Sequence, residues 1–254
     1  MTYDNSRPRL AVGAVLGECF DLVRANWLYY ALISVFLIGA PNFLLQVFQM
    51  QAKTLGHGGY QLGLWGLFLG FLGLVTLAQA MILVGALASE GDERLALSAM
   101  VRGGLKFALP LFALLVVGGL GVTLAALLLL VPAFVLATVW SVAIPAYFTE
   151  DISIRGALAR SAALTKGSRW AIFGVLLCFS GIYLALCAVV GLVIGLVLAL
   201  SSDTWTLETA AAVARMVMTP LSAPYQTCLS VAIYNGLRRS KESATSKSLL
   251  DAFN

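Results

Sequence analysis

FALPLFALLVVGGLGVTLAALLLLVPAFVLATVWSVAIPAYF, residues 107–148, contains no charged side chain. A helix of about 20 apolar residues is long enough to cross the hydrocarbon core of a bilayer. This run of 42 residues is twice that length. We therefore expect two membrane-spanning helices, 107–128 and 132–148. A tight turn near Leu130-Val131-Pro132 should join them, because proline disfavours the continuation of a helix.

The composition of the whole chain also indicates a membrane location. Of the 254 residues, 60% are hydrophobic and 11% are charged, and the mean hydropathy is +0.93. An average soluble domain has about 25% charged residues. Sixteen bases and twelve acids are too few to cover the surface of a soluble protein of this size. The composition therefore excludes a soluble globular protein.

Four further uncharged runs have the length of a transmembrane helix. They are 27–47, 60–88, 170–200 and 216–237. Six spans would place fourteen of the sixteen bases on one side of the bilayer, all except Lys53 and Arg215. The basic side of a membrane protein faces the cytoplasm. Glu18, Asp21 and Arg24 interrupt the first apolar stretch, so we expect no cleaved signal peptide and both termini in the cytoplasm.

Helical periodicity predicts three amphipathic helices, near 10–24, 93–105 and 152–166, each ahead of a pair of spans. In the second, a polar stripe recurs every four residues, formed by Arg94, Ser98, Arg102 and Lys106. We interpret each as a helix on the cytoplasmic membrane surface. The predicted fold is all-α, with six transmembrane helices in three hairpins, each preceded by a cytoplasmic amphipathic helix. It forms one membrane domain, 1–240, followed by a polar cytoplasmic tail, 241–254.

Residues that could carry chemistry are sparse. The single histidine, His57, lies in a short glycine-flanked loop, and the four cysteines lack metal-ligand spacing. We expect no metal, no cofactor and no histidine-dependent catalysis. The middle of each span lacks an ionisable group, which disfavours a proton-coupled transporter. Glycines spaced by four residues predict close helix packing, either within the subunit or between subunits; they are Gly66, Gly70, Gly191 and Gly195.

Charged residues beside the predicted amphipathic helices form a candidate interface for lipids or a partner. The set is Arg94, Arg102, Lys106, Glu150, Arg155, Arg160, Lys166 and Arg169. Basic side chains near an anionic membrane surface contribute about 1 kcal/mol each. We interpret the acidic pair Glu150 and Asp151 as a complement to the dipole of the helix that follows, with Asp151 or Ser153 as its N-cap.

The segment that starts at Glu150 resembles a known family. Read as E-D-x-S-x-x-x-A-L-A-R-S-x-x-L-T-K-G-x-x-W, it is similar to bacterial membrane proteins of the glycerophosphoryl diester phosphodiesterase membrane-domain family and their YciC-like relatives. The matching positions are Glu150, Ser153, Ala157, Leu158, Arg160, Ser161, Leu164, Thr165, Lys166, Gly167 and Trp170. The stretch AIYNGLR, 232–238, resembles the family's final helix. The resemblance implies a six-span protein of the bacterial inner membrane.

In some relatives such a membrane domain precedes a soluble phosphodiesterase domain. Only seventeen residues follow the last predicted span here, and a catalytic barrel needs about 250, so we expect no enzyme activity. The first hypothesis is a protein that engages anionic lipids or organises the membrane, in lipid handling. The alternatives are an anchor or assembly partner of another protein, a homo-oligomer, and a transporter of an amphiphilic solute. We expect no nucleic-acid partner, because the bases flank apolar runs.

Overall fold

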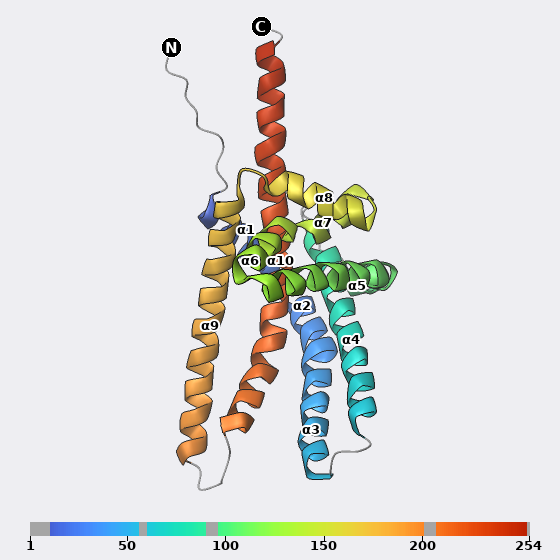
Figure 1. Cartoon of the computed structure of the whole chain (residues 1–254), viewed down its shortest axis with the longest axis vertical. Coiled ribbons are helices and arrows are strands. Elements are labelled where there is room, and N and C mark those ends of the chain that lie inside the picture. The colour runs from blue at the N-terminus through green and yellow to red at the C-terminus, as the bar shows by residue number, and fades with distance from the viewer. Residues whose placement is uncertain (1–10, 56–59, 90–95, 201–206, 253–254) are drawn as a thin grey trace. The chain divides into compact units, whose positions relative to one another are not determined.

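The computed structural model describes residues 11–55, 60–89, 96–200 and 207–252, and within these ranges all regular structure is helical (Figure 1). The elements are α1 (Val12–Ala25), α2 (Trp27–Ser34), the π-helix η1 (Val35–Gly39), α3 (Ala40–Leu55), α4 (Tyr60–Ala88), α5 (Leu97–Leu128), α6 (Leu130–Trp140), α7 (Ala143–Glu150), α8 (Ile154–Thr165), α9 (Arg169–Leu200) and α10 (Leu207–Ala252). The predicted all-α class is confirmed. His57 and Arg94 lie outside the described residues.

Five stretches of the described chain are long and apolar enough to cross a membrane. They are Trp27–Gln49, Gly63–Ala88, Leu97–Leu128, Val131–Glu150 and Arg169–Val197. They correspond to five of the six predicted spans. The remaining one, 216–237, lies within α10 and is not among the five; this stretch contains polar side chains such as Ser222, Gln226 and Asn235. The six-span arrangement in three hairpins therefore stays a prediction.

Helix α5 unites two elements that the sequence predicts separately. The predicted amphipathic helix 93–105 and the span 107–128 form one continuous helix from Leu97 to Leu128. Polarity changes between Lys106 and Phe107, but neither residue ends a helix, so the helix continues. Pro110 lies inside it; a membrane helix tolerates the loss of one backbone hydrogen bond when its surroundings compensate.

The chain turns between α5 and α6 at Leu129, whose backbone is extended with φ −165° and ψ 143°. The sequence predicts this turn slightly later, at Leu130-Val131-Pro132. Pro132 instead occupies the first turn of α6, where a missing N–H removes no intrahelical hydrogen bond. A second turn, at residues 141–142, divides the predicted span 132–148 into α6 and α7.

Two helices at the predicted membrane surface form as separate elements. Helix α1 buries Val15, Cys19 and Leu22 along one face. Helix α8 buries Ala157, Ser161 and two further residues of its last turn. Their position on a membrane surface stays a prediction. The predicted polar tail, 241–254, continues as part of α10 up to Ala252.

The contacts divide the chain into two compact units. Unit 1 comprises Met1–Leu22, Pro110–Cys178 and Cys228–Asn254, and unit 2 comprises Val23–Leu109 and Phe179–Thr227. In unit 1, α8 packs against α6 and α7 over a small core of Leu114, Ala143 and Ala157. In unit 2, α4 packs against α2, η1 and α3.

Close packing in the described chain uses other glycines than the sequence motifs predict. At Gly66, Gly70, Gly191 and Gly195, an added Cβ would meet no atom within 4 Å. The described residues therefore do not pack at these four positions, and their role in contacts between subunits stays a prediction. In unit 2, a Cβ at Gly85 would lie 2.9 Å from the Tyr30 ring, and one at Gly104 would lie 2.3 Å from Met81 Cγ. The spacing rule misses them because the partner side chains come from elsewhere in the chain.

Candidate functional site

The main polar cluster of unit 1 is centred on Glu150, the last residue of α7. Arg160 Nε, from α8, lies 2.8 Å from each carboxylate oxygen and forms a salt bridge with Glu150. The Tyr234 hydroxyl, from α10, donates a hydrogen bond to Oε1 at 3.1 Å. Hydrogen bonds to a charged group are stronger than those between neutral groups. The cluster therefore connects the consecutive helices α7 and α8 to α10, which is far from both in the sequence.

The corner between α7 and α8 places Glu150 toward these partners. Helix α7 ends because Asp151 adopts a left-handed conformation, with φ 45° and ψ 45°, which aspartate tolerates better than most residues. Ser153 then begins α8, because its Oγ accepts a hydrogen bond from the Gly156 N–H at 3.2 Å. Of the two N-cap candidates, Ser153 is therefore the one that the structure selects.

Tyr234 is buried, with 1% of its surface exposed, and its hydroxyl lies between two polar groups. One is Glu150, and the other is Thr149, whose Oγ1 is 2.7 Å from the Tyr234 oxygen and 2.9 Å from the Pro145 carbonyl oxygen. A buried hydroxyl without a hydrogen bond costs about 1–3 kcal/mol. The partners of Tyr234 avoid this cost, so this arrangement stabilises the junction between α7 and α10.

Two further contacts hold α8 in place. The buried Ser161 hydroxyl donates to the Val139 carbonyl oxygen at 2.7 Å and ties α8 to α6. Lys241 Nζ, from α10, donates a hydrogen bond to the Ala163 carbonyl oxygen near the end of α8. The helix dipole favours a cation at this end of a helix. Burial is the main cause that lowers the pKa of Lys241, and the nearby positive charges of Arg160 and Lys166 lower it further. Lys241 therefore lies near two other basic side chains, Arg160 and Lys166.

A second carboxylate contact joins α1 to α10. Glu18 Oε1 accepts hydrogen bonds from Asn235 Nδ2 at 3.0 Å and from Arg239 Nη2 at 2.9 Å. Glu18 is not among the site residues predicted from the sequence. Spacing on α10 holds a signal, because Asn235 and Arg239 are four residues apart and share one face. Pairing across more than 200 residues is not visible in such spacing.

The predicted interface residues fall into distinct groups. Arg160 and Glu150 pair with one another. Arg102 and Lys106 are exposed on α5 and belong to unit 2, and Arg94 lies outside the described residues. The other three are exposed in unit 1, and no described carboxylate forms a salt bridge with any of them; they are Arg155, Lys166 and Arg169.

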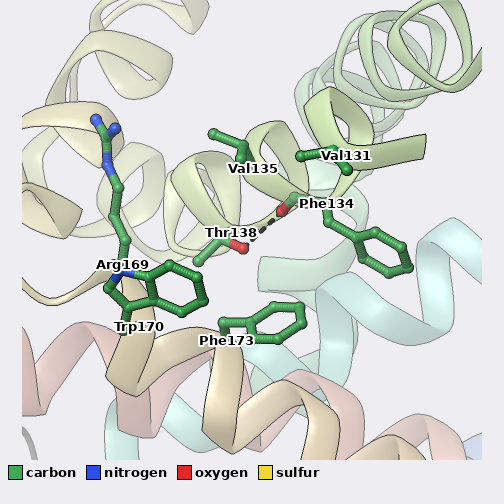
Figure 2. A pocket seen from close by; sticks show the side chains of 7 residues that line it. All are labelled: Val131, Phe134, Val135, Thr138, Arg169, Trp170 and Phe173. Carbon is green, nitrogen blue, oxygen red and sulfur yellow. Dashed lines mark hydrogen bonds between the residues drawn. The ribbon is translucent and has the colours of Figure 1, made fainter. Parts of the chain in front are cut away.

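An apolar groove of about 320 Å³ lies between α6 and the first turns of α9. Its lining residues are Val131, Phe134, Val135, Thr138, Arg169, Trp170 and Phe173. Figure 2 shows the Phe173 ring between those of Trp170 and Phe134. Its centroid is 6.2 Å from Trp170 and 6.1 Å from Phe134, both edge to face. The Thr138 hydroxyl donates to the Phe134 carbonyl oxygen at 2.6 Å, so it is satisfied within α6.

No group of three or more histidine, cysteine, aspartate or glutamate residues in the described chain could hold a metal ion.

The two stretches that meet at Glu150 lie in the part of the chain that matches a protein family. Residues 106–239, just over half of the chain, match the family of the membrane domain of glycerophosphoryl diester phosphodiesterase. The chain belongs to this family. No curated protein and no solved structure matches it.

The match places the described site within the common part of this membrane-domain family. Residues 106–239 contain Glu150, Arg160 and Tyr234, and they also contain the groove. The resemblance read from the sequence is therefore confirmed. What the structure adds is that the two stretches which carry it, 150–170 and 232–238, contact each other directly through Glu150.

Proposed function

We propose that this chain is a non-enzymatic protein of the bacterial inner membrane, with both termini in the cytoplasm, that binds anionic phospholipids. The binding surface would be the segment from α8 to the start of α9. The observation that supports this proposal is the set of three exposed bases without a described carboxylate partner, namely Arg155, Lys166 and Arg169. Arg160, in the same segment, is neutralised by Glu150.

The position of these bases at the end of a candidate span favours contact with lipid headgroups. The span Arg169–Val197 starts at one of them. Its second residue, Trp170, is 86% exposed, and tryptophan beside basic residues is typical of the membrane–water interface. Each base near an anionic surface contributes about 1 kcal/mol, so three contribute about 3 kcal/mol. That is enough to enrich anionic lipid around the protein.

One observation supports a binding role over a catalytic one, and the family's description supports a role at phospholipids. The carboxylate of Glu150 is occupied by Arg160 and Tyr234, which gives it a role in holding helices together. A glycerophosphoryl diester is the polar part of a phospholipid without its acyl chains, so the family's description agrees with a protein that operates on or beside phospholipids.

Lipid mass spectrometry on the purified protein tests the proposal. The full chain is extracted from bacterial membranes in a mild detergent, and the ratio of retained phosphatidylglycerol to phosphatidylethanolamine is compared with that of the bulk membrane. We expect enrichment of phosphatidylglycerol around the unaltered chain. The triple variant Arg155→Gln, Lys166→Gln, Arg169→Gln should lose most of it.

A matched control removes bases that already have a partner. Arg160→Gln and Arg239→Gln each remove one positive charge, but each base is paired with a carboxylate. Both should retain more of the enrichment than a single change at an unpaired base. A retained lipid ratio equal to that of the bulk membrane, or the same loss in control and test variants, would overturn the proposal.

A further inference from the structure

We infer that the groove between α6 and α9 is a binding site for one anionic phospholipid, with an acyl chain along the groove and the headgroup at Lys166 and Arg169. This inference rests on the proposed function and deepens it. It concerns a single defined site, whereas the proposed function requires only a general preference for anionic lipid. Both parts of the site lie within unit 1.

The headgroup end combines two sources of positive potential. Arg169 is the first residue of α9 and lines the groove. Its side chain extends from the Trp170 end of the groove, while Val131 and Phe134 lie at the other end (Figure 2). The first N–H groups of a helix have no intrahelical acceptor, and the dipole makes this end positive. A helix start that also carries an arginine therefore suits a phosphate group.

The turn that precedes α9 leaves room for a headgroup. Gly167 has φ +92°, and an added Cβ there would meet no atom within 4 Å. Lys166, on one side of it, is exposed and has no described carboxylate partner. Thus Lys166 and Arg169 flank an open turn, and the inferred site places the phosphate over it.

The groove itself suits a hydrocarbon chain better than a polar ligand. Its lining is aliphatic and aromatic apart from Thr138 and Arg169, and the Thr138 hydroxyl is already bonded to the backbone of α6. Burying a polar ligand there would leave its polar groups without partners. The volume of about 320 Å³ lies at the small end of the range for ligand sites, about 300–1,000 Å³. That size fits part of one acyl chain.

The positive charge at the Arg169 end of the groove favours anionic over zwitterionic lipids. A zwitterionic lipid would place its own cation near Lys166 and Arg169, which costs electrostatic energy. An anionic lipid such as phosphatidylglycerol has no such cation. The site therefore distinguishes the two by headgroup charge, while both present the same acyl chains to the groove.

Site-specific photocrosslinking tests the inference. A benzoylphenylalanine replaces Val131, which is 70% exposed at the end of the groove away from Arg169, in the full chain reconstituted into vesicles of equal phosphatidylglycerol and phosphatidylcholine. The same probe at Leu177, 60% exposed on α9 and outside the groove, is the matched control. We expect the adducts at 131 to favour phosphatidylglycerol by about fivefold or more, and those at 177 to follow the vesicle composition.

Headgroup variants complete the test. Arg169→Gln in the Val131 probe background should reduce the preference about fivefold, whereas Arg239→Gln, a base paired with Glu18 that does not line the groove, should leave it unchanged. Equal adducts at 131, or a preference that Arg169→Gln leaves intact, would overturn the inference. If phosphatidylglycerol is still enriched in the purified protein, the proposed function survives that result. If the enrichment is absent as well, both fail.

Discussion

Replacing Glu150 by glutamine should uncouple α8 and α10 from α7. The carboxylate accepts hydrogen bonds from Arg160 on both oxygens at 2.8 Å and from Tyr234 at 3.1 Å. Glutamine keeps the shape of the side chain but has one acceptor oxygen and no charge. The variant therefore retains at most part of the hydrogen bonding and loses the ion pair with Arg160.

The expected effect lies between that of a surface pair and that of a buried one. Exposed ion pairs contribute about 0.2–1 kcal/mol, and hydrogen bonds to charged groups contribute about 1.5–3 kcal/mol. The side chains of Arg160 and Glu150 are 41% and 25% exposed. We therefore expect a coupling free energy of about 1–2 kcal/mol between these two residues.

A double-mutant cycle measures that coupling. Glu150→Gln, Arg160→Gln and the double variant are unfolded by denaturant in a mild detergent, and the free energies of unfolding are compared. The pair Glu18 and Arg239 serves as the control cycle, because Arg239 is 68% exposed and donates one hydrogen bond to Glu18. It should give about 0.5 kcal/mol. A Glu150–Arg160 coupling no larger than that of the control would refute the reasoning.

Three other predictions concern packing, thiol ionisation and helix capping. Gly104→Ala places a Cβ 2.3 Å from Met81 Cγ and should destabilise the protein by about 1–3 kcal/mol. At Gly66 an added Cβ meets no atom within 4 Å, so Gly66→Ala should stabilise the protein by about 0.5–1 kcal/mol. Thermal unfolding in detergent compares the two variants, and equal shifts in their unfolding temperatures would contradict this prediction. Burial raises the pKa of the Cys19 thiol to about 12 from an ordinary value of 9.0. The contribution of this thiol to stability is therefore constant below pH 9.0 and declines as the pH rises above 9.0, because the thiol of the unfolded chain ionises first. At about pH 8, iodoacetamide should therefore modify Cys19 only after unfolding, and rapid modification of the folded protein, detected by mass spectrometry, would show the burial to be wrong. Ser153→Ala removes the N-cap of α8 and should cost about 1 kcal/mol, whereas Ser153→Asp should retain most of the stability, and equal losses in both variants would exclude capping as the cause.

The candidate membrane spans could be predicted from the sequence, because they follow from the length of its uncharged runs. The five candidate spans overlap five of the predicted runs, because a bilayer imposes a minimum length and disfavours charge. Helix boundaries depend on weaker local signals. The change of polarity after Lys106 is not a helix end, and α5 passes through it. Pro132 is compatible with the first turn of a helix as well as with a turn, so its presence did not locate the break at Leu129.

Only part of the candidate site could be predicted from the sequence. The resemblance identified the stretches around Glu150 and Tyr234, and the structure brings them together. Periodicity describes one helix at a time, so it did not predict that these residues pair across 84 positions. The same limit applies to the groove, because Phe134 and Phe173 come from different helices. Only packing brings such side chains to one place.

The short corner after Glu150 constrains how the length of this segment can vary. Asp151 ends α7 and Ser153 caps α8, so a fixed number of residues separates the end of one helix from the start of the next. Inserting one residue into the first turn of α8 would rotate the rest of the helix by about 100° relative to the corner. Arg160 would then turn away from Glu150, and Ser161 would turn away from the Val139 carbonyl. A single-residue insertion at the start of α8 should therefore be far more damaging than most substitutions in the corner.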